Sequence, residues 1–254
     1  MSKRRVVVTG MGILSPVGND LDSSWNAIVN GRSGIGPITH FDASAFPTRI
    51  AGEVRNFDPS LWIAPKDIKK MDPFVHYGVA TSMMAIKDAG LEIADSDAER
   101  IGVAIGAGIG GLKGIEDTTL KYAEGGARKI SPFYVPSTII NMIAGQVSIM
   151  TGAKGPNIAT VTACTTATHN IGLAMRMIQY GDADAMIAET SKSPSPCCFA
   201  AVSIAIVGPK PHMLMSSFVT TSQRPRGSRA STHSSRVAPA ESAEASHSCS
   251  RTTA

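Results

Sequence analysis

Cysteine is scarce in this sequence, and the few cysteines are not spaced as metal ligands. The four are Cys164, Cys197, Cys198 and Cys249, with no CxxC pair and no Cys/His spacing that would form a zinc site. The sequence therefore predicts neither a metal centre nor a disulfide framework. We also expect no cofactor.

Long apolar runs are missing as well. The basic residues at positions 3–5 precede an apolar run, Val6–Val8, that is too short for the core of a signal peptide. No stretch reaches the length of a transmembrane helix. We therefore expect a cytoplasmic protein without membrane contact. Its 254 residues are 43% hydrophobic, which is enough to bury a core.

The last part of the chain has few acidic residues. After Thr190 the only acids are Glu241 and Glu244, against seven Lys and Arg, so the net charge of +4 belongs to this tail. Ser, Pro, Arg, Thr and Ala dominate it, and helical or alternating periodicity is absent. We predict a folded region at 1–188 and a disordered, solvated tail at 189–254. Because aromatic residues do not alternate with the basic ones, the tail is not expected to bind nucleic acid.

Short β-branched runs alternate with helical patterns in the folded region. Strands are expected at 5–10, 101–106, 157–161 and 185–188, helices at 21–29, 74–89, 137–150 and 167–179, and one strand-like segment in the tail at 202–207. The first strand is expected to be buried on both faces, and Met11–Gly18 to be a loop. The alternation predicts an α/β layered sheet.

Cys164 follows the third of these strands and precedes the fourth helix. The partial positive charge at a helix N-terminus stabilises a thiolate, so this position suits a nucleophile. The alternative is a small, buried hydrophobic residue without reactivity. Spacing alone leaves both interpretations open.

Four segments around this cysteine occur in the order found in one protein family. They are Arg5–Gly18, Gly31–Ile35, Arg128–Thr138 and Thr162–Thr165. Together they resemble the elongating β-ketoacyl-acyl-carrier-protein synthases of bacterial fatty-acid synthesis, of the synthase II type. The resemblance covers about residues 4 to 188.

The resemblance implies a thiolase-like fold, in which two similar layers form a five-layer α/β sandwich and subunits pair as homodimers. This chain would supply the first layer. The family cysteine takes an acyl group from acyl carrier protein as a thioester, and Cys164 matches it. Malonyl-acyl carrier protein then loses carbon dioxide, and the carbanion attacks the thioester. The resemblance implies that the Cys164 N–H is one donor to the oxyanion.

Three further residues near the cysteine have two interpretations each. The resemblance places Ile109 and Phe133 at positions that line or gate the acyl channel, whereas apolar residues are more often simply core. For Ile109 we favour the channel. His169 lies five residues after Cys164 on the expected helix, which points it away from the thiolate. We expect His169 to pack or to form a hydrogen bond, and not to act as a catalytic base.

The sequence departs from the family after Ala188. The family's two catalytic histidines, a lysine and a glycine-rich oxyanion segment lie in its C-terminal half, in motifs that this sequence does not contain. His212, His233 and His247 stand in other contexts and cannot be assigned those roles. We interpret the change near Glu189 as a shift of the coding frame, with a divergent natural tail as the alternative. Resequencing the gene distinguishes the two.

Two other functions are weighed against this one. Gly10-Met-Gly12 after a strand suggests dinucleotide binding, but the third glycine is Ser15 and Pro16 interrupts the helix that should follow. A tight turn is the better interpretation. The other alternative is a non-catalytic remnant or interaction chain that needs a complementary subunit, although such chains usually lack the cysteine. Because the first layer of the family fold normally packs on the second, this chain would leave a wide apolar face exposed, and we expect aggregation or poor expression.

Overall fold

The computed structural model describes residues 4–191 and 201–208. Its helices are α1 (Leu21–Val29), α2 (Pro65–Ile68), α3 (Pro73–Ala89), α4 (Leu112–Gly125), α5 (Tyr134–Thr138), α6 (Met142–Thr151) and α7 (Thr166–Tyr180). Short 3-10 turns are η1 (Pro59–Leu61), η2 (Ala98–Arg100), η3 (Ala127–Lys129) and η4 (Ala163–Thr165). The strands are β1 (Val7–Leu14), β2 (Ile35–Pro37), β3 (Ile50–Gly52), β4 (Ile101–Ala107), β5 (Asn157–Ile158), β6 (Ala185–Ser191) and β7 (Ala201–Val207).

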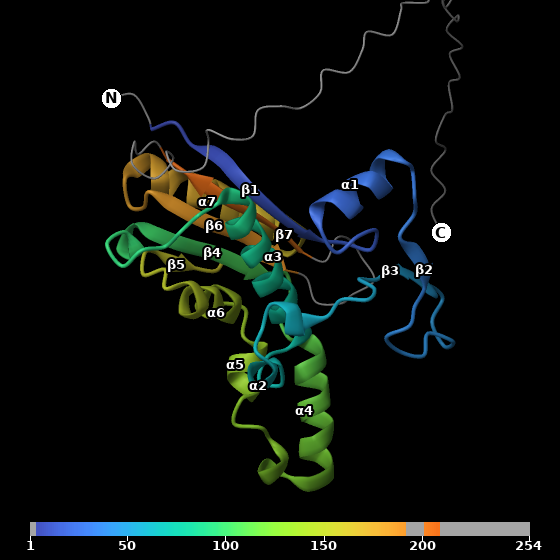
Figure 1. Ribbon diagram of the computed structural model, residues 1–254. Helices are drawn as coiled ribbons and strands as arrows, with labels where there is room; N and C mark the ends of the chain where they lie inside the picture. Colours follow the sequence, from blue (N-terminus) through green and yellow to red (C-terminus); the bar gives the residue numbers. More distant parts are fainter. Residues whose placement is uncertain (1–3, 192–200, 209–254) are drawn as a thin grey trace, which may run out of the picture. The chain divides into compact units, whose positions relative to one another are not determined.

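Five strands form one mixed sheet in the order β1-β7-β6-β4-β5 (Figure 1). Strand β4 is parallel to both β5 and β6, whereas β7 is antiparallel to both β6 and β1. Strands β2 and β3 form a separate antiparallel pair. The parallel pairs bring the carboxyl ends of β4, β5 and β6 to the same edge of the sheet, and the Cys164 turn follows β5 at that edge.

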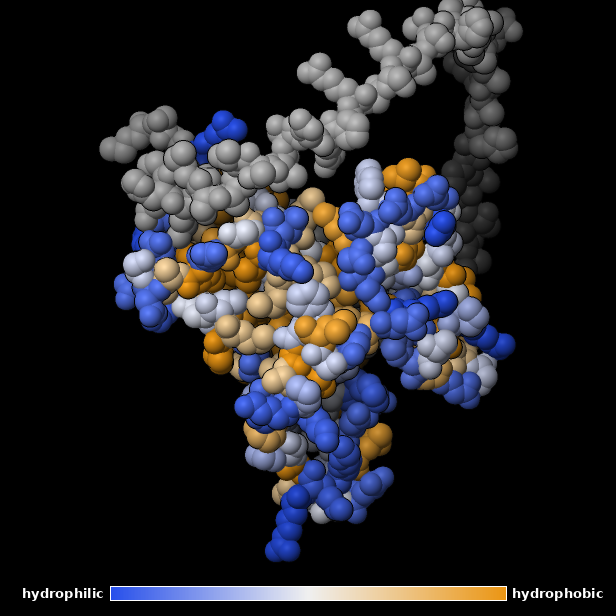
Figure 2. All heavy atoms as spheres, viewed as in Figure 1, coloured by the Kyte–Doolittle hydropathy of each residue, from blue (hydrophilic) through white to orange (hydrophobic). Residues whose placement is uncertain are grey.

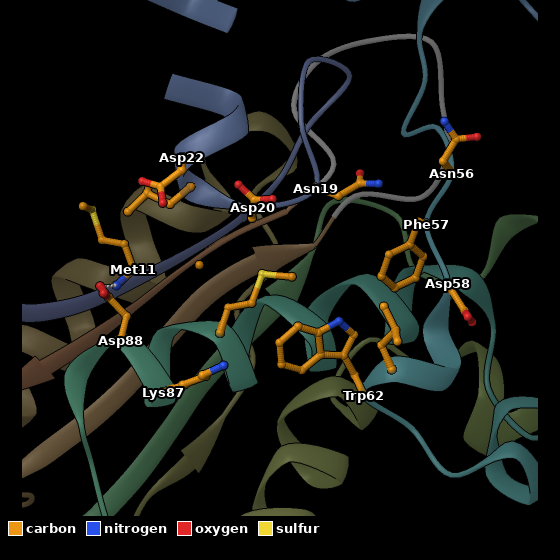
Figure 3. A pocket seen from close by; sticks show the side chains of 14 residues that line it. Met11, Asn19, Asp20, Asp22, Asn56, Phe57, Asp58, Trp62, Lys87 and Asp88 are labelled. Atoms are coloured by element: carbon orange, nitrogen blue, oxygen red, sulfur yellow. Dashed lines mark hydrogen bonds between the residues drawn. The ribbon is translucent and has the colours of Figure 1, made fainter. Parts of the chain in front are cut away.

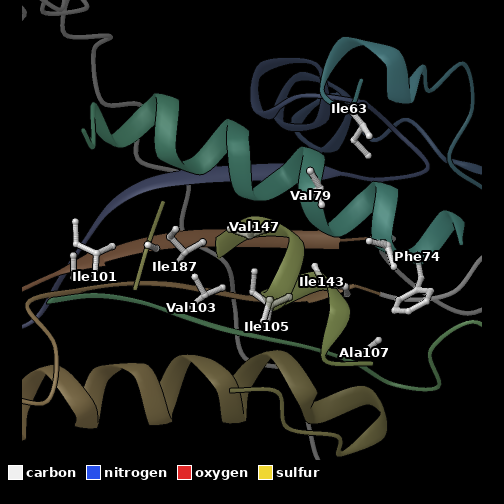
Figure 4. Close-up of a cluster of buried hydrophobic side chains, with 14 of the residues drawn as sticks. Ile63, Phe74, Val79, Ile101, Val103, Ile105, Ala107, Ile143, Val147 and Ile187 are labelled. Atoms are coloured by element: carbon white, nitrogen blue, oxygen red, sulfur yellow. The ribbon is translucent and has the colours of Figure 1, made fainter. Parts of the chain in front are cut away.

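One face of the sheet is covered by α3 and α6. Alternate residues of β4, from Ile101 to Ala107, pack there against Phe74, Val75 and Val79 of α3 and against Ile143, Ala144 and Val147 of α6. Figure 4 shows these side chains between the helices and the strands. Every residue of β4 is buried, as expected for a central strand of an α/β sheet.

The opposite face is covered by α7. Its Ala174 and Ile178 pack against Ala104, Met186 and Ala188 and against Ile204 and Ile206 of β7. Successive side chains along a strand therefore point in turn to the two helix layers, which is the two-residue periodicity of an extended chain. Three layers result in the described residues, with the sheet in the middle.

Helix α3 shows how the sequence sets both ends of an element. Asp72 accepts a hydrogen bond from the Phe74 N–H at the first turn, and Pro73 occupies the first helical position. Gly90 ends the helix with a positive φ of 58°, which costs glycine little. The predicted helix at 74–89 ending at Gly90 is confirmed.

The first strand differs from its prediction. It continues through the expected loop to Leu14, and it forms an edge of the sheet, where Val7, Val8 and Met11 are exposed. The prediction of burial on both faces is wrong because β1 is an edge strand: Gly10 and Gly12 face the α3 backbone, whereas side chains between and before them are exposed.

The segment after β4 also differs. The single helix predicted at 137–150 is two, α5 and α6, separated by residues 139–141, and α4 was not predicted at all. The strand predicted at 157–161 pairs only at Asn157 and Ile158.

The expected strands at 101–106 and 185–188 are present, and the strand-like segment at 202–207 corresponds to β7. The sheet thus includes residues beyond position 188. The predicted boundary between a folded region at 1–188 and a tail at 189–254 stays a prediction. Residues 192–200 and 209–254, which contain most of the predicted tail, lie outside the described residues. None of the helices in the described ranges has the length and hydrophobicity that crossing a bilayer requires.

Candidate active site

Cys164 lies in η4, the short turn between strand β5 and helix α7. Its thiol is free and exposed. The residue before it, Ala163, has a φ of 51°, in the left-handed region that residues with a Cβ rarely adopt. The sequence prediction of a cysteine at the first turn before the helix is therefore confirmed in position, with a strained residue beside it.

Hydrogen bonds from the first turn of α7 hold this segment. The Thr162 N–H donates to Thr166 Oγ1 at 3.0 Å, and the Thr162 carbonyl accepts from Thr165 Oγ1 at 2.7 Å. Thr166 Oγ1 in turn donates to the Ala163 carbonyl at 2.9 Å. Thr162 and the strained Ala163 itself are thus tied to the residues that begin α7.

Asn170, on the next turn of α7, is completely buried and joins the segment after β5 to strand β6. Its Oδ1 accepts from the N–H and the hydroxyl of Thr160, at 3.2 and 2.7 Å, and its Nδ2 donates to the Glu189 carbonyl at 2.9 Å. The backbone leaves the β5 ladder after Ile158, so this side chain replaces the missing strand pairing.

The glycine-rich loop after β4 lies against the Cys164 turn. A Cβ placed on Gly108 would lie 3.4 Å from the Ala163 carbonyl oxygen, so the two backbones are close neighbours. Ile109 follows Gly108 and is 54% exposed. The residue before Ile109 thus contacts the Cys164 turn, whereas the role of Ile109 at an acyl channel stays a prediction.

Phe133 lies farther along the chain, at the start of α5. The ring is 44% exposed, and the Lys70 ammonium lies 5.6 Å from its centre. The other end of α5 contacts the glycine-rich loop, where Gly111 N–H donates to the Thr138 carbonyl at 3.1 Å. The structure therefore connects Phe133 to the loop through its helix, and its predicted role at the acyl channel stays a prediction.

His169 forms a hydrogen bond, as the sequence predicts. Its Nδ1 lies 2.7 Å from Thr162 Oγ1. Both side chains line a groove of about 460 Å³ along α7, which Leu173, Met175 and Arg176 extend.

A second cleft, of about 780 Å³, lies between α1, η1 and α3 (Figure 3). None of its lining residues belongs to the Cys164 turn. Its acids hold backbone groups: Asp20 accepts from Ser23 N–H, Asp58 from Ser60 N–H and Asp88 from Met11 N–H. Asp20 and Asp58 thus cap local turns and Asp88 links α3 to β1, so these three acids have structural roles; a fourth acid, Asp22, also lines the cleft.

Glu189 is a buried acid that the sequence did not single out. It has no exposed surface, and Thr81 Oγ1 and Ser82 Oγ donate to its carboxyl at 2.6 and 2.8 Å. Burial raises the pKa of Glu189 to about 7, despite the opposing hydrogen bonds from Ser203, Thr81 and Ser82. The sequence signal for this site is that Glu189 is the single acid in the strand pattern Ala185–Ser191, which indicates a buried carboxyl group.

The titratable side chains in the described ranges form no cluster of three or more His, Cys, Asp or Glu that could hold a metal ion. The chemistry available at the Cys164 turn is therefore that of a thiol with nearby N–H groups. The first N–H groups of a helix have no partner within it, and the Cys164 N–H lies among them.

The sequence matches a family model and many curated relatives. The family model described as Beta-ketoacyl synthase, N-terminal domain, matches residues 3–203. A 3-oxoacyl-acyl-carrier-protein synthase 2 of Vibrio cholerae is 59% identical over 195 residues, which cover 77% of this chain and 47% of the relative. One of Coxiella burnetii is 55% identical over 188 residues, covering 74% and 45%. The chain spans about half the length of these relatives.

Solved structures give the same fold at lower identity. A ketosynthase in complex with its type II PKS acyl-carrier protein aligns with a TM-score of 0.70 and 21% identity, covering 82% of this chain and 64% of that one. A beta-ketoacyl synthase from Burkholderia phymatum aligns with a TM-score of 0.70 and 23% identity, covering 82% and 60%. The predicted thiolase-like α/β fold is confirmed.

Proposed function

Since this chain belongs to the β-ketoacyl synthase family, we propose that Cys164 is the acyl-accepting nucleophile of a 3-oxoacyl-acyl-carrier-protein synthase reaction. The observation that carries the proposal is the place of the thiol: it is exposed, in a turn at the N-terminus of α7.

The first step is a thioester exchange. The Cys164 thiolate attacks the carbonyl of an acyl-acyl carrier protein, the carbon–sulfur bond of the donor breaks, and the carrier thiolate leaves and takes up a proton. During the attack the carbonyl oxygen becomes an oxyanion, and the Cys164 N–H can donate to it. The described residues therefore supply a nucleophile and one stabilising donor.

The second step is a decarboxylative condensation. A malonyl-acyl carrier protein loses carbon dioxide, and the electron pair of the broken carbon–carbon bond attacks the acyl-Cys164 carbonyl. The Cys164 thiolate leaves, and the product is a 3-oxoacyl chain extended by two carbons. His169 lies on α7, the helix that follows Cys164, but its Nδ1 forms a hydrogen bond with Thr162 Oγ1. We propose that the described residues perform the first step and that the second needs further groups.

The comparisons support a proposal for the partner. The names of the relatives include acyl carrier protein, and one similar structure holds a ketosynthase with an acyl-carrier protein. We propose the acyl and malonyl forms of acyl carrier protein as partners, a homodimer as the assembly and the cytoplasm as the location.

Incubation of the full chain with radiolabelled acyl-acyl carrier protein tests the first step. We expect label on Cys164, none in Cys164→Ser, and parental labelling in the control Cys249→Ser. An unlabelled chain would overturn the proposed nucleophile. Addition of malonyl-acyl carrier protein then tests the proposal that condensation needs groups beyond the described residues. We expect the label to stay on Cys164. Release of a labelled 3-oxoacyl product would contradict this proposal.

A further inference from the structure

The segment that carries Cys164 is held by side chains more than by the sheet. Strand β5 pairs with β4 only through Asn157 and Ile158, and the nucleophile comes six residues later. Between them, Thr160 is fixed by Asn170 and Thr162 by residues of the first turn of α7. The position of the Cys164 thiol therefore depends on the hydrogen bonds between α7 and Thr162.

All three polar groups of Thr162 are bonded to α7 or to the turn before it. Its N–H is taken by Thr166 and its carbonyl by Thr165, whose backbone N–H also donates to it at 3.1 Å. Its hydroxyl is taken by His169, at 2.7 Å. His169 is thus the contact that fixes the side chain of Thr162, one residue before the strained Ala163.

Strain gives that contact its importance. A residue with a Cβ stays in the left-handed region only when its surroundings over-determine it. Ala163, at a φ of 51°, is flanked by Thr162 on one side and by the Cys164 turn on the other. Loss of the His169 bond removes the restraint on the Thr162 side chain, while Thr165 and Thr166 still hold its backbone. With this restraint gone, Ala163 can relax toward a negative φ, and Cys164 then moves away from the helix N-terminus.

We infer that His169 is a positioning residue, which holds Cys164 at the N-terminus of α7 through its hydrogen bond to Thr162. The inference rests on the proposed role of Cys164. His169 does not touch the reacting atoms and carries no proton in either step. Its effect is to hold the Cys164 thiol at the N-terminus of α7.

The test is the rate at which iodoacetamide alkylates Cys164 in the full chain, with the modified peptide identified by mass spectrometry so that Cys197, Cys198 and Cys249 are counted separately. We expect His169→Phe and Thr162→Val each to react roughly two- to tenfold more slowly at neutral pH, the range that one hydrogen bond supplies. Because both changes break the same contact, the double variant should be no slower than the slower single variant.

Rescue separates positioning from a general loss of structure. His169→Asn keeps a polar group near Nδ1 and should react close to the parental rate. Adding Ala163→Gly to His169→Phe should restore the rate, since glycine adopts a positive φ without strain. Thr168→Val, on the same helix and in the same groove, is the matched control and should react at the parental rate.

A parental rate in His169→Phe, additive effects in the double variant, or no rescue by Ala163→Gly would each overturn the inference. The proposed function fails differently. If acyl-acyl carrier protein does not label Cys164 of the parent chain while the alkylation rates change as expected, the positioning stands and the acyl-transfer role is wrong.

Discussion

The carboxyl group of Glu189 lies inside the contact between α3 and the strands β6 and β7. The groups that contact it are the hydroxyls of Thr81, Ser82 and Ser203, and the hydroxyl of Ser203 also donates to that of Thr81 at 3.1 Å. Hydroxyls can donate to a carboxylate, but without a cation they do not offset the loss of hydration. The neutral acid is therefore favoured in the folded state.

This asymmetry makes stability depend on pH. The pKa of Glu189 is about 7 when folded, against an ordinary value of 4.5. Between these values the unfolded chain releases the proton and the folded chain keeps it, so the free energy of unfolding falls as pH rises. The difference corresponds to about 3 kcal/mol, fully present below pH 4.5 and lost above pH 7.

Glu189→Gln removes this titration and keeps a polar side chain for the hydroxyls. We expect urea unfolding of the parent to weaken from pH 5 to pH 8, whereas Glu189→Gln should lose much less stability over the same range and be the more stable of the two at pH 8. Equal pH profiles for the two proteins would show that Glu189 is not the group responsible.

At the scale of elements, β1 and α3 approach each other through glycine. A Cβ on Gly12 would overlap the Thr81 carbonyl oxygen and lie 2.7 Å from the Cβ of Met84, and Gly10 faces Ala85 and Ala89 in the same way. The tight turn expected at Gly10-Met-Gly12 is therefore wrong, and so is the nucleotide-binding alternative, because these residues lie within β1.

Gly12→Ala should therefore push the strand from the helix. We expect a loss of roughly 1–3 kcal/mol in the free energy of unfolding, the usual cost of overpacking, measured by urea denaturation. Gly172→Ala in α7 is the matched control: an added Cβ there has no neighbour within 4 Å, so a gain of roughly 0.5–1 kcal/mol is expected from helix propensity alone. If Gly12→Ala unfolds at the parental urea concentration, the close packing is not present in solution.

The elements that sequence patterns predicted are those with local signals. Helix α3 has Asp72 at one end and Gly90 at the other, and β4 is an unbroken apolar run. The short β5 and the break between α5 and α6 depend on contacts made elsewhere in the chain, such as the Asn170 bonds to Thr160. The motif around Cys164 predicted the place of this cysteine just before α7, but not the bonds that hold its turn.

At the scale of the whole molecule, apolar side chains remain at the surface of several described elements. Trp25 and Val29 of α1, Ile149 of α6 and Tyr180 of α7 are each more than 60% exposed. Figure 2 shows hydrophobic residues interspersed with polar ones on the face viewed. Single exposed apolar residues are ordinary, but α7 also presents Leu173 and Met175 beside its groove.

This distribution predicts self-association of the chain expressed alone. We expect size-exclusion chromatography with light scattering to give masses above the monomer that grow with concentration, because burial of apolar surface favours association. Leu173→Ser with Met175→Ser should reduce the apparent mass if the α7 face is the contact. Trp25→Ser removes an exposed apolar side chain from α1 instead. If the α7 face is the contact, this change should leave the apparent mass as it is in the parent chain. A monodisperse monomer with a cooperative thermal transition would contradict the prediction.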